Sequence, residues 1–251
     1  MTQNLPIHST NSGLTLSRIK APKHIAIIPD GNRRWAKKRW LLPWQGHLAG
    51  IKSLKKILKT ALELKIPYFT FWAGSCENLT RRSKIEINFL FKLYEKYFLK
   101  IAKDRTIHEN QIKLNIFGRW KELVPPKTKE TIEKAINLTK NYNKYYLTIL
   151  VAYNGTDEML GAVKNIVELS KTKAPDITPD LIKENLWTGD LPPVDLLIRT
   201  GGEPHNSTGF MMWLTCDSQF YFTETLWPDF SEKEFKEAIE EYQKKERRFG
   251  A

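Results

Sequence analysis

The feature that most constrains the fold is an alternation of short apolar runs with longer stretches of helical periodicity. Five apolar runs predict buried strands, at 24–28, 68–74, 112–117, 146–153 and 194–198. Apolar residues spaced as on one helix face fill most of the intervals, at 46–65, 84–103, 125–142, 157–170 and 231–248. This alternation predicts an α/β protein with a mostly parallel β-sheet flanked by helices.

Residues 21–251 contain no internal repeat and no low-complexity linker, so we expect a single domain over that range. Residues 1–20 are polar, without an apolar signal core, and are expected to form a mobile lead-in. No apolar run reaches 18 residues, so no membrane-spanning helix is expected.

The composition limits the partners without choosing one. Cys76 and Cys216 are too few for a disulfide framework and lack metal-binding spacing, which favours a reducing, cytoplasmic location. The net charge of +12 favours an anionic partner: a nucleic acid, a phosphorylated substrate or a membrane surface, with peripheral association. Nucleic-acid binding is disfavoured, because most aromatic residues fall in strand cores or on apolar helix faces.

Polar loops follow four of the predicted strands. Their sequences are PDGN, GSCEN, AYNG and RTGGE. In parallel sheets, ligands bind beyond the carboxyl ends of the strands, so these loops are expected to converge at one edge.

The first of these loops has the composition of a phosphate site. Gly31 permits a tight turn, and Arg33 and Arg34 are donors suited to phosphate oxygens. Asp30 would repel a bare phosphate unless Mg²⁺ lay between them, because Mg²⁺ takes few protein ligands and completes its shell with phosphate and water oxygens. The alternative is that Asp30 only pairs with a surface arginine.

Taken together, the segments resemble the cis-prenyltransferase family (undecaprenyl diphosphate synthase and dehydrodolichyl diphosphate synthase). The resemblance runs from about residue 23 to the C-terminus and lies in HIAIIPDGNRRWAKK with GHLAG, FWAGSCENLTRRSKIE, VDLLIRTGGE, FYFTETLWPDF and ERRFG. It implies a parallel sheet with a hydrophobic tunnel, usually in a homodimer. It also implies Mg²⁺-dependent condensation of isopentenyl diphosphate with an allylic diphosphate, forming cis double bonds.

The resemblance assigns roles to residues of this chain. Asp30 would hold Mg²⁺ as a catalytic residue, and Asn78 would take part in proton removal. The allylic diphosphate would contact Gly31, Asn32, Arg33, Arg34, Trp35 and His47. Other substrate contacts would come from Ser75, Cys76, Glu77, Arg82, Arg199, His205 and Ser207. Arg248 and Gly250 would reach the site of a neighbouring subunit.

Several positions depart from the family pattern. His205 replaces an arginine, Pro43 often an arginine, and Gln219 an acidic metal ligand, which makes Gln219 a doubtful ligand. Asn154 and Thr156 also stand where glycine and arginine are common. These departures leave three alternatives to ordinary elongation: prenyl transfer to another acceptor, one subunit of a heteromer, or an inactive scaffold.

Large rings on the second predicted helix bear on product length. Phe91, Tyr94, Tyr97 and Phe98 correspond to the family's tunnel wall and would favour a short or medium product. Their other interpretation is ordinary core packing.

Overall fold

The computed structural model describes residues 21–172 and 174–245. The predicted N-terminal segment (1–20), Arg248 and Gly250 lie outside these residues. No helix in the described ranges is long and apolar enough to cross a bilayer.

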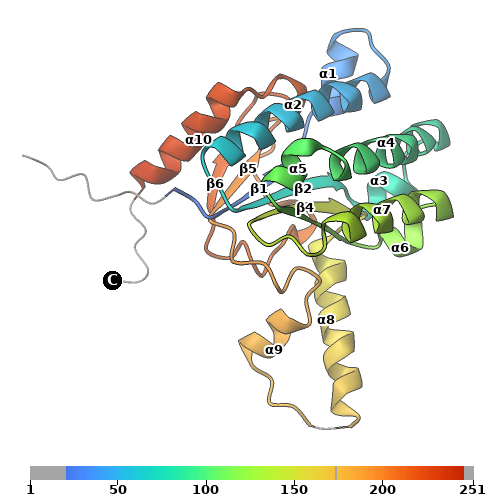
Figure 1. Ribbon diagram of the computed structural model, residues 1–251, viewed down its shortest axis with the longest axis vertical. Coiled ribbons are helices and arrows are strands. Elements are labelled where there is room, and N and C mark those ends of the chain that lie inside the picture. Colours follow the sequence, from blue (N-terminus) through green and yellow to red (C-terminus); the bar gives the residue numbers. More distant parts are fainter. Residues whose placement is uncertain (1–20, 173, 246–251) are drawn as a thin grey trace, which may run out of the picture.

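A single six-stranded sheet forms the centre of the domain (Figure 1). Its order is β3-β4-β2-β1-β5-β6, and every neighbouring pair is parallel. The strands are β1 (His24–Ile28), β2 (Tyr68–Gly74), β3 (Ile112–Phe117), β4 (Tyr145–Val151), β5 (Leu196–Arg199) and β6 (Gln219–Phe222). The α/β prediction with a parallel sheet is therefore confirmed.

The helices alternate with the strands along the described chain. The longer ones are α2 (Pro43–Glu63), α4 (Lys84–Ala102), α7 (Pro126–Thr139), α8 (Gly155–Ser170) and α10 (Glu232–Lys244). Shorter helices are α1 (Asn32–Lys38), α3 (Cys76–Thr80), α5 (Arg105–Glu109), α6 (Trp120–Leu123) and α9 (Pro179–Glu184), with the 3-10 turns η1 (Ser207–Gly209) and η2 (Trp227–Asp229).

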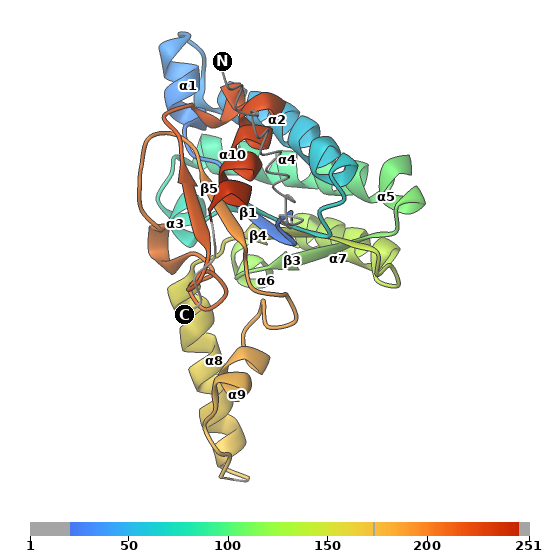
Figure 2. The same ribbon diagram turned by 90° about the vertical axis from the view of Figure 1, so that its left-hand side faces the viewer.

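The strand side chains divide between two cores because successive residues point to opposite faces. In β1, Ile25 and Ile27 join a core shared with α2, α4, α7 and α10, whereas Ala26 and Ile28 join a second core. The second core is closed by residues 187–214. Helices α8 and α9 extend away from the sheet (Figures 1 and 2).

The five predicted strands are present, and two of them have shifted bounds: β4 is Tyr145–Val151 rather than 146–153, and β5 is Leu196–Arg199 rather than 194–198. The β4 ladder ends at Val151 rather than 153, because Ala152 turns into the left-handed region (φ 51°). The sequence pattern does not predict bounds for the short helices or for β6, because segments of four to seven residues are too short for a clear periodicity of apolar residues.

Candidate active site

The carboxyl ends of β1, β2 and β5 open into one cavity of about 470 Å³. Its polar end is lined by predicted site residues: Asp30, Gly31, Asn32, Arg33, Arg34, His47, Ser75, Asn78, Arg82, Arg199 and Ser207. The other end is apolar, and it lies between α2 and α4. The predicted convergence of loops at one sheet edge is thus observed for PDGN, GSCEN and RTGGE.

Asp30 lies at the centre of the polar end. Its Oδ1 is 3.1 Å from Nη2 of Arg34, and its Oδ2 accepts a hydrogen bond of 3.2 Å from Nη2 of Arg199. The Asp30 side chain is 34% exposed, so its carboxylate remains open to the cavity. The arginine pairing that the sequence left as an alternative is therefore present, but it lies inside the cavity.

Two glycines make the turn around Asp30. Gly31 has φ 110°, which favours glycine, and begins α1 as its N-cap. Gly201 has φ 89°, and a Cβ there would lie 2.6 Å from Nη2 of Arg34. Thr200 fixes the same turn, because its hydroxyl donates to the Asp30 carbonyl at 2.8 Å.

Arg199 is held by two different groups. Besides Asp30, its Nη1 donates to the backbone carbonyl of His205 at 2.7 Å. The His205 ring instead points toward Glu203, 3.9 Å from a carboxylate oxygen, and does not line the cavity. His205 thus supports Arg199 through its main chain.

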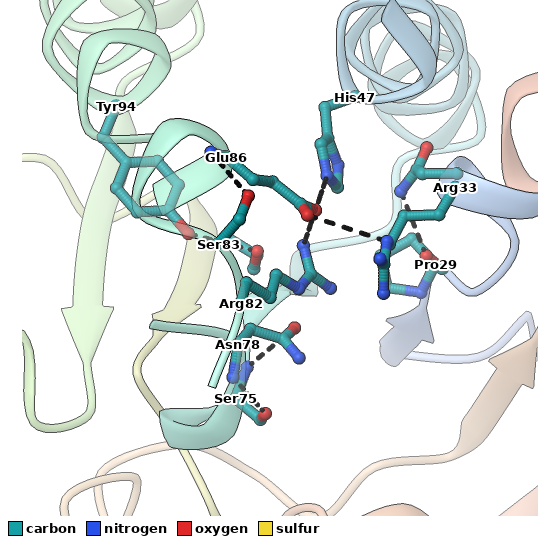
Figure 3. Close-up of polar contacts among 11 residues, drawn as sticks. Pro29, Arg33, His47, Ser75, Asn78, Arg82, Ser83, Glu86 and Tyr94 are labelled. Atoms are coloured by element: carbon teal, nitrogen blue, oxygen red, sulfur yellow. Dashed lines mark hydrogen bonds and ion pairs between the residues drawn. The ribbon is translucent and has the colours of Figure 1, made fainter. Parts of the chain in front are cut away.

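Glu86 contacts the side chains of Arg82, His47 and Arg33 at the cavity (Figure 3). Its Oε1 accepts from Nη1 of Arg82 at 2.9 Å and pairs with Nε2 of His47 at 3.2 Å, while Oε2 is 3.7 Å from Nε of Arg33. The hydrogen bond with His47 and the charges of Arg82 and Arg33 hold the pKa of Glu86 below its usual value, against the effect of burial. Glu86 therefore stays ionised and holds the side chains of Arg82, His47 and Arg33 in place.

The S-x-E-N segment starts α3. Ser75 caps the helix by accepting from the Asn78 N–H at 3.2 Å, and the Asn78 side chain accepts from the Ser75 N–H at 3.4 Å. Both residues line the cavity, as does Arg82, and Figure 3 shows the three side chains.

Cys76 and Glu77, the two middle residues of this segment, do not line the cavity. The Asn154 amide donates to Oε1 of Glu77 at 3.1 Å and accepts from the Cys76 N–H at 3.3 Å. The Cys76 thiol lies 3.1 Å from the Ala152 carbonyl, and burial raises its pKa to about 12. These contacts give Cys76 a structural role rather than substrate contact.

Two other predicted residues lie away from the cavity in this chain. Trp35 donates from its indole N–H to Asp229 at 2.7 Å and stacks under Arg39. Gln219 pairs in register with Leu196, three residues before Arg199, roughly 10 Å along the strand. Gln219 is therefore not brought beside Asp30 within one chain.

The geometry fits Mg²⁺ shared with a diphosphate. Among the described residues, no group of three His, Cys, Asp or Glu side chains could hold a metal. Mg²⁺ bound to phosphates commonly takes only one or two carboxylates, and Asp30 offers an exposed one beside two arginines. The site therefore suits a metal that arrives with its substrate.

The apolar end of the cavity follows one face of α4. Its lining residues Leu90, Leu93, Tyr94, Tyr97, Phe98 and Ile101 recur every three or four positions. Ile101 lies 15 residues after Glu86, roughly 22 Å along the helix axis. Phe91, on a neighbouring face, packs on the core and does not line the cavity.

The sequence analysis gave no supporting role to two residues, Glu86 and Asn154. Glu86 has a usable signal: it follows Ser83 at capping spacing and stands four residues after Arg82, so it faces that arginine on the helix. Asn154 lies in AYNG, one of the loops expected at the sheet edge, but its contacts have no local signal because its partners lie 77 and 78 residues away.

Comparisons with known proteins agree with this geometry. A family model described as "Putative undecaprenyl diphosphate synthase" matches residues 28–250. The chain is 40% identical to a protein of Pyrococcus furiosus over 251 residues (98% of this chain, 94% of the relative), named tritrans,polycis-undecaprenyl-diphosphate synthase (geranylgeranyl-diphosphate specific). A relative of the same name from Methanocaldococcus jannaschii is 40% identical over 234 residues (91% and 82%).

Two solved structures share the fold. One is lavandulyl diphosphate synthase from Lavandula x intermedia in complex with dimethylallyl diphosphate, with TM-score 0.85 and 31% identity, covering 92% of this chain and 99% of that one. The other is a probable undecaprenyl diphosphate synthase from Campylobacter jejuni, with TM-score 0.74 and 27% identity, covering 92% and 100%. The chain therefore belongs to the cis-prenyltransferase family, enzymes that transfer prenyl groups by condensing isopentenyl diphosphate with an allylic diphosphate.

Proposed function

We propose that the chain is a Mg²⁺-dependent cis-prenyltransferase that binds its allylic diphosphate in the cavity, with the diphosphate at Asp30 and the prenyl tail along α4. One observation carries this proposal: a single cavity joins a cationic polar end to an apolar end. That combination suits a ligand with an anionic head and a hydrocarbon tail.

The cations would act on the leaving group. Negative charge grows on the diphosphate as the allylic C–O bond breaks, and preset donors stabilise that growth. Arg33, His47 and Arg82 are already held in place by Glu86, so little reorganisation is needed. When bound, Mg²⁺ would neutralise charge on the same phosphates, held by Asp30.

Asn78 would serve the proton loss that completes condensation. An amide is a poor base, so we assign it an orienting role, with a phosphate oxygen taking the proton. Its fixed position in the α3 capping box supports that assignment.

Arg199 and Ser207 would hold the isopentenyl diphosphate. Both line the cavity, and Arg199 is 6% exposed with its Nε lacking a hydrogen-bond partner among the described residues. His205 stands where the family pattern has an arginine, and its ring points to Glu203. This subsite therefore has less positive charge than the family pattern implies. That observation favours, as a second candidate, transfer of the prenyl group to an acceptor other than isopentenyl diphosphate.

The proposal extends to the allylic primer and to the length of the product. The curated relatives are named for geranylgeranyl diphosphate and undecaprenyl diphosphate, whereas one solved relative holds dimethylallyl diphosphate. Tyr94, Tyr97 and Phe98 line the apolar end with large rings, which supports the prediction of a short or medium product.

A product assay tests the proposal. The protein is incubated with labelled isopentenyl diphosphate, Mg²⁺ and dimethylallyl, farnesyl or geranylgeranyl diphosphate, and products are separated by chromatography. We expect cis-prenyl products whose formation falls on the order of 100-fold in Asp30→Asn, because that variant loses the charge that holds the metal. Asp229→Asn, a matched change outside the cavity, should retain activity.

The other outcomes separate the alternatives. Consumption of allylic diphosphate without incorporation of isopentenyl label would favour another acceptor. No turnover with any primer would contradict the proposal for the chain alone and favour a heteromer subunit or a scaffold. Products of ten or more isoprene units would contradict only the length prediction.

A homodimer is part of the proposal. In this homodimer, Arg248 and Gly250 would reach the neighbouring subunit's site. They would add to the isopentenyl diphosphate subsite, for which Arg199 and Ser207 alone come from within one chain.

A further inference from the structure

A cluster of exposed apolar side chains lies where α1 meets α2 and α4 begins. Trp40 is 97% exposed, Ile85 69% and Leu42 52%. Trp44 and Phe89 lie beside them with ring centroids 5.9 Å apart, and a groove of about 360 Å³ runs between Trp44, Phe89 and Ile85. We call Trp40, Leu42, Trp44, Ile85 and Phe89 the corner patch.

The backbone at Trp40 is costly for a tryptophan. Trp40 follows α1 at the left-handed position (φ 56°), where its N–H bonds the Lys37 carbonyl at 3.2 Å and the Leu41 N–H bonds the Ala36 carbonyl at 2.9 Å. Glycine usually takes this position in such a helix ending, and a bulky residue there is strained. Because the Trp40 ring is almost wholly exposed, contacts within the chain do not offset that strain.

Positive charge surrounds the corner patch. Lys37 and Lys38 occupy the last turn of α1, and Lys84 and Lys92 occupy the exposed side of α4. These four lysines form no ion pair within residues 21–172 and 174–245. Arg39 is different, since Asp229 neutralises it at 3.0 Å.

We propose that the corner patch docks the protein onto an anionic lipid bilayer. Tryptophan is enriched at the membrane–water interface, where its ring lies at headgroup level. Lysines around such an apolar patch add attraction to anionic lipids. The α1–α2 corner also projects from the molecule at the end opposite α8, so a flat surface can reach it (Figures 1 and 2).

The proposal extends beyond prenyl transfer and does not depend on it. A nucleic acid would need stacking aromatics spaced along a basic groove, whereas here the apolar residues form one compact patch. A bilayer satisfies the aromatic, aliphatic and cationic parts of the patch together.

Vesicle binding tests the proposal with the full chain. Sedimentation is measured with vesicles of equal parts phosphatidylcholine and phosphatidylglycerol, and with vesicles of phosphatidylcholine alone. We expect binding to the anionic vesicles, much weaker binding to the neutral ones, and loss of binding at high salt. Trp40→Gly should weaken the partition coefficient on the order of tenfold, and Lys37→Gln with Lys38→Gln roughly 30-fold.

Matched controls separate docking from general effects. Lys164→Gln with Lys171→Gln makes the same charge change on α8, and Ile177→Ser removes an apolar side chain that is 59% exposed. Neither should change vesicle binding. Trp40→Gly should keep its melting temperature and its turnover of a dispersed substrate, because glycine suits φ 56° and Trp40 does not line the cavity.

Three results would overturn the proposal. The first is failure of the wild-type protein to bind anionic vesicles. The second is equal weakening of binding by the α8 control pair, which would mean that net charge alone acts. The third is a change of oligomeric state in Trp40→Gly by light scattering without a change in vesicle binding, which would make the patch a protein interface.

Discussion

Asp30 and Glu86 are two carboxylates at one cavity, held in different ways. Asp30 is about a third exposed and faces the cavity between Arg34 and Arg199. Glu86 is 3% exposed and lies behind Arg82 and two other partners. The exposed carboxylate is therefore the one that we propose to meet a metal, whereas the buried one keeps Arg33, His47 and Arg82 in place.

His24 makes folding sensitive to acid. It is fully buried at the start of β1, with ring nitrogens 2.8 Å from the Pro192 carbonyl and from the Thr70 hydroxyl. Burial lowers its pKa from 6.5 to about 4. Below pH 6.5 the unfolded chain binds a proton that the folded chain does not, so stability falls as the pH drops toward 4.

We expect the free energy of unfolding to lose up to about 3 kcal/mol over that range from His24 alone. Denaturant titrations at several pH values measure it. His24→Gln should flatten the dependence of the unfolding free energy on pH, even if it lowers stability overall. His205→Gln, which changes an exposed ring, should leave that dependence as it is. An unchanged slope in His24→Gln would contradict this assignment.

At the scale of elements, we expect the cavity face of α4 to limit how far a prenyl chain can extend. Tyr97 lines the apolar end but is only partly buried, so Tyr97→Ala should cost about 2 kcal/mol of stability and lengthen the products. Chromatography of the products measures the shift.

Phe91→Ala is the matched control, because Phe91 belongs to the same helix but not to the cavity lining. It should lower stability without changing product length. The same lengthening in both variants would mean that loosening of α4, rather than the shape of its cavity face, sets the length.

The turn after β5 holds Asp30 and Arg34 in place. In Gly201→Ala, the new Cβ would lie 2.6 Å from Nη2 of Arg34 and 3.1 Å from the Asp30 carbonyl, at φ 89°. We expect a loss of about 1–2 kcal/mol in stability and a clear loss of turnover. Thermal unfolding and the product assay check both.

Gly161→Ala, inside α8, is the control. Its Cβ would make an ordinary contact of 3.5 Å with Trp187, so stability should rise by roughly 0.5–1 kcal/mol with activity retained. Full activity in Gly201→Ala would show that the turn tolerates displacement of Arg34.

At the scale of the whole molecule, the proposed dimer makes each site depend on two chains. If Arg248 acts in the partner's site, then Asp30→Asn and Arg248→Ala mixed one to one should recover activity in mixed dimers. Half of the dimers would be mixed and each would hold one intact site, so about a quarter of wild-type activity is expected.

Unfolding and refolding the two variants together, followed by the product assay, measures this recovery. Each variant refolded alone is the control and should stay inactive. No recovery in mixtures shown to contain mixed dimers would mean that Arg248 serves its own subunit.

The sequence by itself determined five of the six strands of the described sheet, the long helices and the parallel arrangement. Periodicity is local: Ile25 and Ile27 alternate with Ala26 and Ile28 wherever the strand is placed. The ends of strands in a parallel sheet also share one edge, so the meeting of Asp30, Ser75 and Arg199 could be predicted from their places in the loops.

Only the tertiary structure decided which side chains face the cavity. Cys76 and Glu77 adjoin Ser75 in sequence, but the Cys76 thiol points to the Ala152 carbonyl and the Glu77 carboxylate to the Asn154 amide. The His205 ring turns away from the cavity while its carbonyl holds Arg199. Gln219 is placed by strand register, and Glu86 by partners on α1, on α2 and in the turn before α4. Such orientations depend on contacts between residues far apart in the chain, which a local pattern does not encode.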